Sequence, residues 1–246
     1  MNIMTNALLA LALTGYVGPP APSATSTFAA AAETLDELKA DIETTIKEAG
    51  KKGLDETQAV DFATRAMDLA NDATDPASRI AAVQVGVSFR FFAKSEELTR
   101  LRGEMWDLVI TKDADEGAKL APLVGSYLKD VDRAATLGKK SKSPEVKAAC
   151  AFVPLEKLLD EDELSEADTK KLAAGLKALK KDFGTVVDPT RKRAWGEFCD
   201  EKLFVLENLA VGSVVPEIEA VDLSGVKFKL SDYRGKVVMI DFWGHW

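Results

Sequence analysis

The sequence is poor in the residues that most often carry chemistry. Its 246 residues include two cysteines, Cys150 and Cys199, and one histidine, His245. There is no Cys-x-x-Cys pair, and His245 has no cysteine or histidine near it, so no metal-binding spacing is present. We therefore assign no catalytic, cofactor-binding or metal-binding residue. We expect the two cysteines to be small buried side chains of helices, because two unrelated positions rarely meet disulfide geometry; a disulfide is the alternative if the chain is exported.

A basic surface for nucleic acid is also lacking. The chain has 32 lysines and arginines against 40 acidic residues, a net charge of −8. Binding to a phosphate backbone needs a basic footprint, so nucleic acid is excluded as a partner. Two short basic clusters, 139–142 and 191–193, lie among acidic residues. We interpret both as solvated helix ends.

No apolar run is long enough for a membrane span. The run Ala7–Leu13 is too short to cross a bilayer and suits the core of a signal peptide. It precedes a proline-rich stretch, 18–24, and the alanines 29–32, which offer small-residue cleavage sites. Residues 1–6 contain no lysine or arginine, unlike a typical signal peptide. We expect residues 1–32 to be a signal peptide and linker of an exported, periplasmic or cell-envelope protein without an integral membrane span; a cytoplasmic location is the alternative.

What is present from residue 33 to residue 209 is a helical pattern. Leu35, Leu38, Ile42 and Ile46 recur at the spacing of one helical face. Helix starts are indicated by Asp75-Pro76, Ser95-Glu-Glu, Ser143-Pro-Glu and Ser165-Glu-Ala-Asp. We find no repeat of fixed length. The sequence predicts a mainly α domain over 33–209, either a helical bundle or an array of helical hairpins.

One segment of this domain is apolar on nearly every face. Residues Ile80–Phe92 are typical of a central helix covered on most sides. The aromatic side chains Phe89, Phe91, Phe92 and Trp106 are expected in the core rather than in a ligand pocket. Charged pairs along the helices are expected on solvated faces.

The character of the sequence changes at residue 211. Pro216 prevents continuation of a helix, and Ser224-Gly225 separates two β-prone runs, 218–223 and 226–230, which predicts a hairpin. Residues 231–235 indicate one helical turn closed by glycine. The apolar run Val237–Phe242 predicts a strand buried on both faces of a sheet.

These last residues resemble the opening of a redoxin domain of the thioredoxin superfamily, of the TlpA/ResA and alkyl-hydroperoxide-reductase/thiol-specific-antioxidant (AhpC/TSA) kind. The resemblance covers residues 211–246 only. The positions that match the family pattern, in order and spacing, are Gly212, Pro216, Gly225, the run 230–236, Asp241-Phe242-Trp243 and Trp246.

The resemblance implies the start of an incomplete α/β thioredoxin-like domain. In this family the segment ending in Trp-x-x-Trp runs into Cys-x-x-Cys, whose first thiolate is stabilised at a helix N-terminus and attacks a substrate disulfide. Here the sequence ends at Trp246. We therefore expect a fragment of an exported thiol–disulfide oxidoreductase of redox homeostasis, with protein thiols or disulfides as partners of the complete domain, and inactive as given.

Two alternatives to this hypothesis stay open. One is a helical domain that binds a protein partner and carries a vestigial redoxin tail. The other is a peroxiredoxin-type antioxidant fragment, which Trp243-Gly-His-Trp246 disfavours because it contains no proline. His245 would lie near the reactive thiol in a complete domain, but we expect a solvent-facing loop residue.

Overall fold

The computed structural model describes residues 33–89, 92, 94–161, 163–210 and 212–241. It divides into two compact units, one ending at Cys199 and one beginning at Asp200, and each is described by itself. The expected signal peptide, Phe91 and the motif Trp243–Trp246 with His245 lie outside the described residues. Among the described residues, no helix is long and apolar enough to cross a lipid bilayer.

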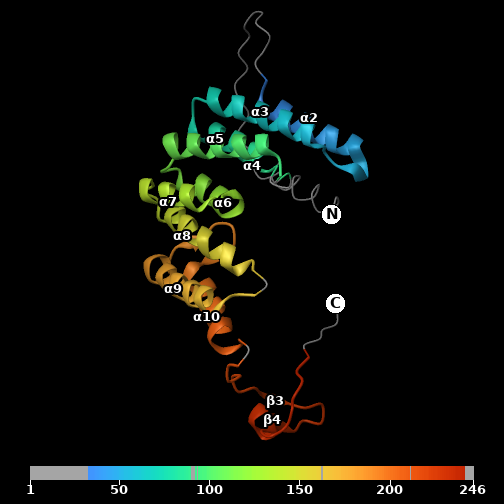
Figure 1. Cartoon of the computed structure of the whole chain (residues 1–246), viewed down its shortest axis with the longest axis vertical. Helices are drawn as coiled ribbons and strands as arrows, with labels where there is room; N and C mark the ends of the chain where they lie inside the picture. The colour runs from blue at the N-terminus through green and yellow to red at the C-terminus, as the bar shows by residue number, and fades with distance from the viewer. Residues whose placement is uncertain (1–32, 90–91, 93, 162, 211, 242–246) are drawn as a thin grey trace, which may run out of the picture. The chain divides into compact units, whose positions relative to one another are not determined.

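The first unit is built from helices, as predicted (Figure 1). The described residues form α2 (Leu35–Ala49), η1 (Gly50–Lys52), α3 (Glu56–Asp72), α4 (Pro76–Val87), α5 (Glu96–Lys112), α6 (Gly117–Tyr127), α7 (Val131–Lys140), α8 (Pro144–Leu159), α9 (Glu166–Phe183) and α10 (Trp195–Asn208). The division between the two units falls within α10.

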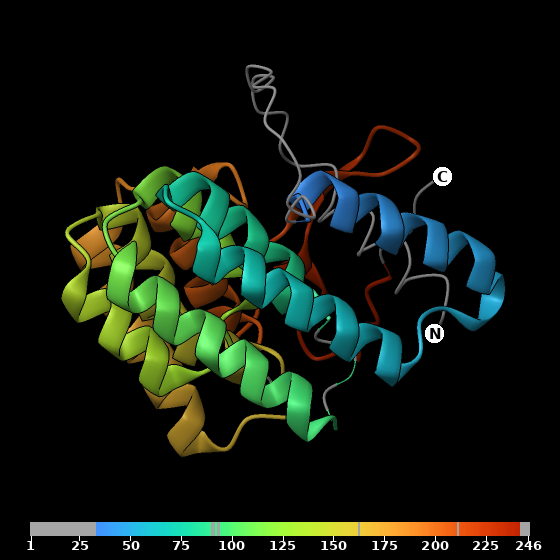
Figure 2. The ribbon, with the colours of Figure 1, turned by 90° about the horizontal axis from the view of Figure 1, so that it is seen from above.

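Each helix of this unit packs mainly against helices close to it in the chain (Figures 1 and 2). Helix α3 contacts α4 and α5, α4 contacts α6, and α5 contacts α7. Helix α8 then contacts α6, α7 and α9. Such near-neighbour packing is typical of a helical array, so the arrangement corresponds to the helical-hairpin alternative.

The helix starts read from the sequence are confirmed by their caps. The side chains of Asp75, Ser95, Ser143 and Ser165 each accept a hydrogen bond from a backbone N–H of the first turn. Asp130 caps α7 in the same way, accepting from two backbone N–H groups. These bonds satisfy donors that the helix itself leaves unpaired.

The apolar segment predicted as a central helix is shorter than expected. Helix α4 is buried along most of its length but ends at Val87 instead of continuing to Phe92. At this end the Ser88 N–H donates to the carbonyl oxygen of Val85, three residues earlier, at 3.2 Å. The Ser88 hydroxyl donates to the same oxygen at 2.6 Å. Phe89 turns inward and stacks on Phe62 at a centroid distance of 6.3 Å. The aromatic prediction is thus confirmed for Phe89, and Trp106 is also buried.

Helix α8 is a second central helix that the sequence did not reveal. One of its faces joins the main core through Val146, Ala149 and Val153. Its other face carries Phe152, whose ring lies 4.9 Å from Trp195 and 5.2 Å from Phe198 of α10. This second group of buried side chains also includes Leu155, Leu172, Leu176 and Leu179.

The basic cluster 191–193 is not a solvated helix end, and this prediction was wrong for Arg191. The cluster lies in a short hairpin of β1 (Val187–Asp188) and β2 (Arg193–Ala194), paired Val187 to Ala194 and Asp188 to Arg193. The Arg191 guanidinium lies 4.6 Å from the Phe152 ring centroid and 2.6 Å from the buried Asp188 carboxylate. A planar cation stacks well on aromatic faces, so the hairpin folds back onto α8 and α10.

The second unit contains the predicted hairpin and helical turn. Strands β3 (Glu219–Val221) and β4 (Lys227–Lys229) pair antiparallel, with Ala220 opposite Phe228. They are followed by η2 (Leu230–Tyr233) and by Gly235, whose φ of 83° closes the turn. The local residue choices were enough to specify these elements.

The strand predicted over Val237–Phe242 does not form within the described residues. Residues 237–241 have no assigned strand pairing, and Val237 and Met239 are fully exposed. Phe242 lies outside the described residues. The prediction of a buried strand was wrong here because a strand needs neighbours on both edges and cover on both faces, and the described part of this unit supplies neither.

Candidate functional site

The hairpin of the second unit is held by one aspartate. Asp222 Oδ1 accepts from the backbone N–H groups of Ser224 at 2.8 Å and Val226 at 2.9 Å. Gly225 occupies the left-handed region with a φ of 82°, which favours glycine because it has no Cβ. This turn fixes the register that brings β3 and β4 together.

A glutamate joins the segment before the hairpin to the helical turn that follows it. Glu217 Oε1 accepts from the Ser231 N–H at 2.9 Å, while the Leu230 N–H donates to the Ile218 carbonyl at 2.9 Å. Hydrogen bonding from Ser231 lowers the pKa of Glu217, because it stabilises the charged carboxylate. The carboxylate therefore stays ionised at neutral pH and holds the start of η2 in place.

These contacts leave a hollow of about 530 Å³ within the second unit. Its wall includes Val214, Val215, Pro216, Glu217, Leu230, Ser231, Tyr233, Arg234, Lys236, Val238 and Ile240. Tyr233 packs edge-on against Phe228 at 6.3 Å, and the Lys236 ammonium lies 5.7 Å from the Tyr233 ring centroid. The hollow is therefore bordered by both aliphatic side chains and cations.

The apolar segment along this hollow alternates in exposure. Val238 and Ile240 line the hollow and are 44% and 43% exposed, whereas Val237 and Met239 are 104% and 92% exposed. Successive side chains of an extended chain point to opposite sides. The segment thus presents two apolar faces, one toward the hollow and one toward solvent.

The two cysteines lie outside this hollow, and Cys150 is a poor nucleophile. Both are buried, as expected, and neither is in a disulfide bond; Cys150 lies in α8 and Cys199 in α10. Burial raises the pKa of the Cys150 thiol to about 12. The thiolate is the reactive form, so Cys150 is almost entirely unreactive near neutral pH. Within the described residues, no cluster of histidine, cysteine and acidic side chains could hold a metal ion.

A buried ion pair in the first unit was not predicted from the sequence. Arg79 of α4 donates from Nη1 to Asp113 Oδ1 at 2.8 Å, and it also donates to the Ala73 carbonyl. Burial raises the pKa of Asp113, since desolvation of the carboxylate outweighs the attraction of Arg79. An arginine within a mostly apolar helix was the available signal. The pair joins the start of α4 to the end of α5 and touches no hollow identified above.

Comparison with known proteins finds similarity over one short stretch of the chain. Part of the chain is similar to ResA. The thiol-disulfide oxidoreductase ResA of Geobacillus kaustophilus (strain HTA426) is 53% identical over 38 residues, 15% of this chain and 22% of the relative. ResA of Geobacillus thermodenitrificans (strain NG80-2) is 44% identical over 52 residues, 21% of this chain and 28% of the relative.

ResA of Bacillus cereus (strain ATCC 10987 / NRS 248) is 40% identical over 40 residues, 16% of this chain and 23% of the relative. The chain thus spans about a quarter of the length of these curated relatives. No family model and no solved structure matches. The similarity supports a thioredoxin-like family and a redox role for the matched stretch.

Proposed function

We propose that residues 211–246 form the N-terminal part of a ResA-like redoxin domain, whose complete form exchanges disulfides with protein thiols. The observation that carries the proposal is the coincidence of sequence similarity to ResA with a hairpin, a closed turn and an extended apolar segment in the expected order. The domain division at 33–209 and 211–246 belongs to the same proposal.

The exposed faces of the apolar segment support this assignment. Val238 and Ile240 on one face, and Val237 and Met239 on the other, would each be removed from water in a sheet covered on both sides. Burial of one aliphatic side chain is worth about 1.5–3 kcal/mol. The segment therefore has a strong drive to pair with further strands of a redoxin domain.

The 246-residue chain itself is proposed to lack thiol–disulfide oxidoreductase activity. It contains no Cys-x-x-Cys, and both of its cysteines are buried. Insulin reduction with dithiothreitol as electron donor should proceed at the rate measured without protein. Faster turnover that is lost in Cys150→Ser or Cys199→Ser would contradict the proposal.

A chimera tests the family assignment directly. Residues 211–246 are joined to the part of Geobacillus kaustophilus ResA that follows its matched segment. We expect a cooperatively folded protein that reduces insulin, because the apolar segment then gains its neighbouring strands. Ile240→Asp should abolish folding of the chimera, whereas Leu223→Asp at the fully exposed hairpin tip should leave it intact. A chimera that stays unfolded would rule out the assignment.

Export is part of the same proposal and rests on the apolar run Ala7–Leu13. Fusion of residues 1–32 to alkaline phosphatase, which is active only after export, should give activity in a bacterial host. Replacing Leu8 and Leu9 by aspartate should remove that activity. A fusion with no activity before the replacement would instead favour a cytoplasmic protein.

A further inference from the structure

An apolar groove runs along the surface between α7 and α8. Its volume is about 350 Å³, and it lies wholly within the first unit. The side chains along it are Val131, Ala134, Ala135, Gly138, Lys139, Lys147, Cys150, Ala151, Pro154 and Phe183. Val131, Ala135 and Ala151 are exposed, so the groove is open to solvent along its length.

Each wall of the groove is one helical stripe made mostly of small side chains. On α7, residues 131, 134, 135 and 138 follow the spacing i, i+3, i+4, i+7, and on α8 residues 147, 150, 151 and 154 repeat it. The two helices approach closely at the floor, where a Cβ on Gly138 would lie 3.2 Å from the Cys150 Cβ. Each stripe is about 10 Å long at 1.5 Å per residue.

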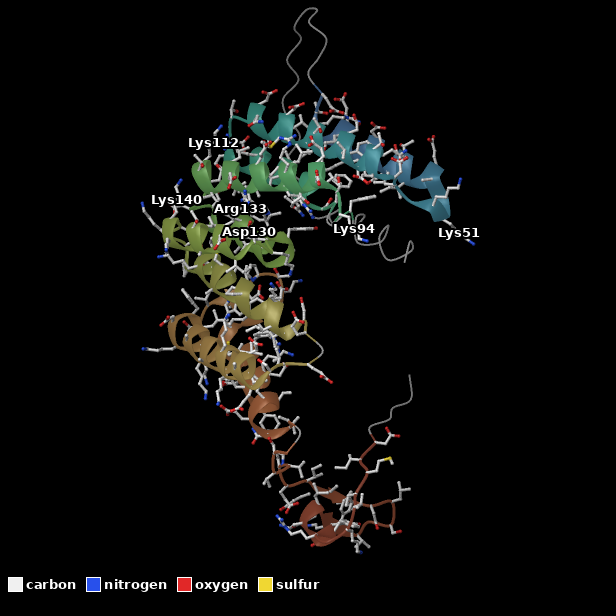
Figure 3. The ribbon with its side chains drawn as sticks, in the orientation of Figure 1. Lys51, Lys94, Lys112, Asp130, Arg133 and Lys140 are labelled. Carbon is white, nitrogen blue, oxygen red and sulfur yellow. The ribbon has the colours of Figure 1, made fainter. Side chains whose placement is uncertain are left out.

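A pair of cations flanks the apolar walls. Lys139 follows the last residue of the α7 stripe, and Lys147 begins the α8 stripe. Within the described part of the chain, neither ammonium is recorded in an ion pair, unlike Lys142, which lies 3.9 Å from Asp115. The neighbouring Lys140 (Figure 3) donates to the Thr111 carbonyl at 3.1 Å and adds to the positive charge of this end of α7.

We propose that this groove binds an amphipathic helix of a partner protein, with acidic side chains flanking its apolar face. Two parallel stripes with helical spacing accept the ridge of a third helix, and small side chains allow close approach. Acidic groups on the partner complement Lys139 and Lys147. An open groove suits a helix better than a small anionic amphiphile, which needs a cavity that encloses most of its surface.

A displayed peptide library tests the proposal with the full-length chain as the target. The library carries helical peptides of about 16 residues, roughly four turns, and binding of the selected peptides is measured by fluorescence anisotropy. We expect the enriched peptides to combine apolar residues at i, i+3, i+4, i+7 with flanking aspartate or glutamate. Helical circular dichroism of each variant confirms that it is folded.

Matched variants show whether binding uses the groove. Ala135→Trp and Ala151→Trp fill it from either wall and should weaken binding about tenfold or more. Ala178→Trp, at an exposed position of α9 outside the groove, should leave binding unchanged. Lys139→Glu with Lys147→Glu should weaken binding most at low salt.

Two results would overturn the proposal. One is selection of peptides whose affinity is the same for the wild type, Ala135→Trp and Ala151→Trp, or the selection of no peptide at all. The other is a result in which no selected peptide depends on the groove, while dodecanoate, used as a small anionic amphiphile, binds the wild type and not Ala135→Trp. That result would assign the groove to an anionic amphiphile. Both are independent of the redoxin assignment, because the groove lies in the first unit.

Discussion

The two units use apolar residues in opposite ways. In the first unit, side chains such as Leu38, Ile42 and Leu172 are completely buried between helices. In the second unit, no described residue beyond Leu203 is buried, although the run from Val237 to Ile240 is entirely apolar. The comparison shows that apolar sequence gives a core only where other elements of the chain supply the opposite surface.

The two units also differ in the interactions that stabilise them. The helices of the first unit gain from burial against one another, as between Trp195, Phe152 and Phe198. The hairpin of the second unit depends on turn chemistry at Asp222 and Gly225 and on the capping contact of Asp232 with the Lys229 N–H. A two-stranded hairpin held by such local bonds is marginal by itself.

The largest effect is expected from truncating a buried aromatic side chain of the first unit, with an exposed aromatic side chain of the second unit for comparison. Trp195→Ala removes a ring that is 1% exposed and should lower the free energy of unfolding by about 3–5 kcal/mol. Tyr233→Ala, at 41% exposure, should change it by less than about 0.5 kcal/mol. Urea denaturation followed by far-UV circular dichroism measures the free energy of unfolding of both variants. Equal losses would remove the contrast between the units.

The next effect concerns the buried ion pair of the first unit. Asp113→Ala leaves the Arg79 guanidinium buried without its carboxylate and should cost about 3 kcal/mol. This is the low end of the usual range, since Asp113 Oδ2 has no hydrogen-bond partner. Arg79→Met combined with Asp113→Leu should cost less than Asp113→Ala alone. A double variant that is less stable than the single one would show that the pair is a net stabiliser.

A smaller effect is expected at the cap of α7. Asp130 accepts from the Arg133 and Asp132 N–H groups at 3.0 Å and pairs with the Arg133 guanidinium at 2.7 Å (Figure 3). Asp130→Ala should cost about 1 kcal/mol at pH 7, whereas Asp130→Asn keeps the cap and should cost less.

The cost of Asp130→Ala should also depend on pH. Hydrogen bonds from Arg133 lower the pKa of Asp130, so the charged carboxylate is favoured in the folded state. Its stabilising contribution is present above the unfolded pKa of about 3.9 and is lost as pH falls through the lower folded pKa. Urea midpoints of wild type and variant should therefore converge at low pH. A difference that persists unchanged there would argue against a carboxylate effect.

The smallest effect on stability is expected from removing the tail. A chain ending at residue 210 should keep the melting temperature of the helical unit and should be more soluble, because Val237–Ile240 no longer expose two apolar faces. A decrease of about 2–4 °C would correspond to a loss of 1 kcal/mol. Such a decrease would show that the tail packs as part of the helical fold.

Much of the fold could be predicted because its signals are local. The caps at Asp75, Ser95, Ser143 and Ser165 each depend on a side chain three residues or fewer from its partner. The turn at Gly225 likewise depends on a glycine φ. The end of α4 at Val87 and the position of Arg191 were mispredicted, because each depends on contacts with distant residues such as Phe62 and Phe152.

The candidate sites also differ in whether the sequence alone could reveal them. The redoxin-like segment could be found from residue types in order, beginning at Gly212 and Pro216. The groove between α7 and α8 could not be found, because Lys139 and Lys147 border one groove only when the two helices pack. The buried pair of Arg79 with Asp113 spans 34 residues, so the sequence did not show that these two charges would meet.

The sequence by itself determined where helices begin, where the hairpin turns, which family the tail resembles and that no Cys-x-x-Cys is present. These depend on capping bonds, glycine torsion angles and residue identity, all of which act within a few residues. Only the tertiary structure decided that α8 is buried on two faces, that Cys150 has a pKa raised to about 12, and that Val237–Ile240 remain exposed. Burial is a property of the surfaces that meet, so an apolar run gains it only from a partner surface that its own residues do not encode.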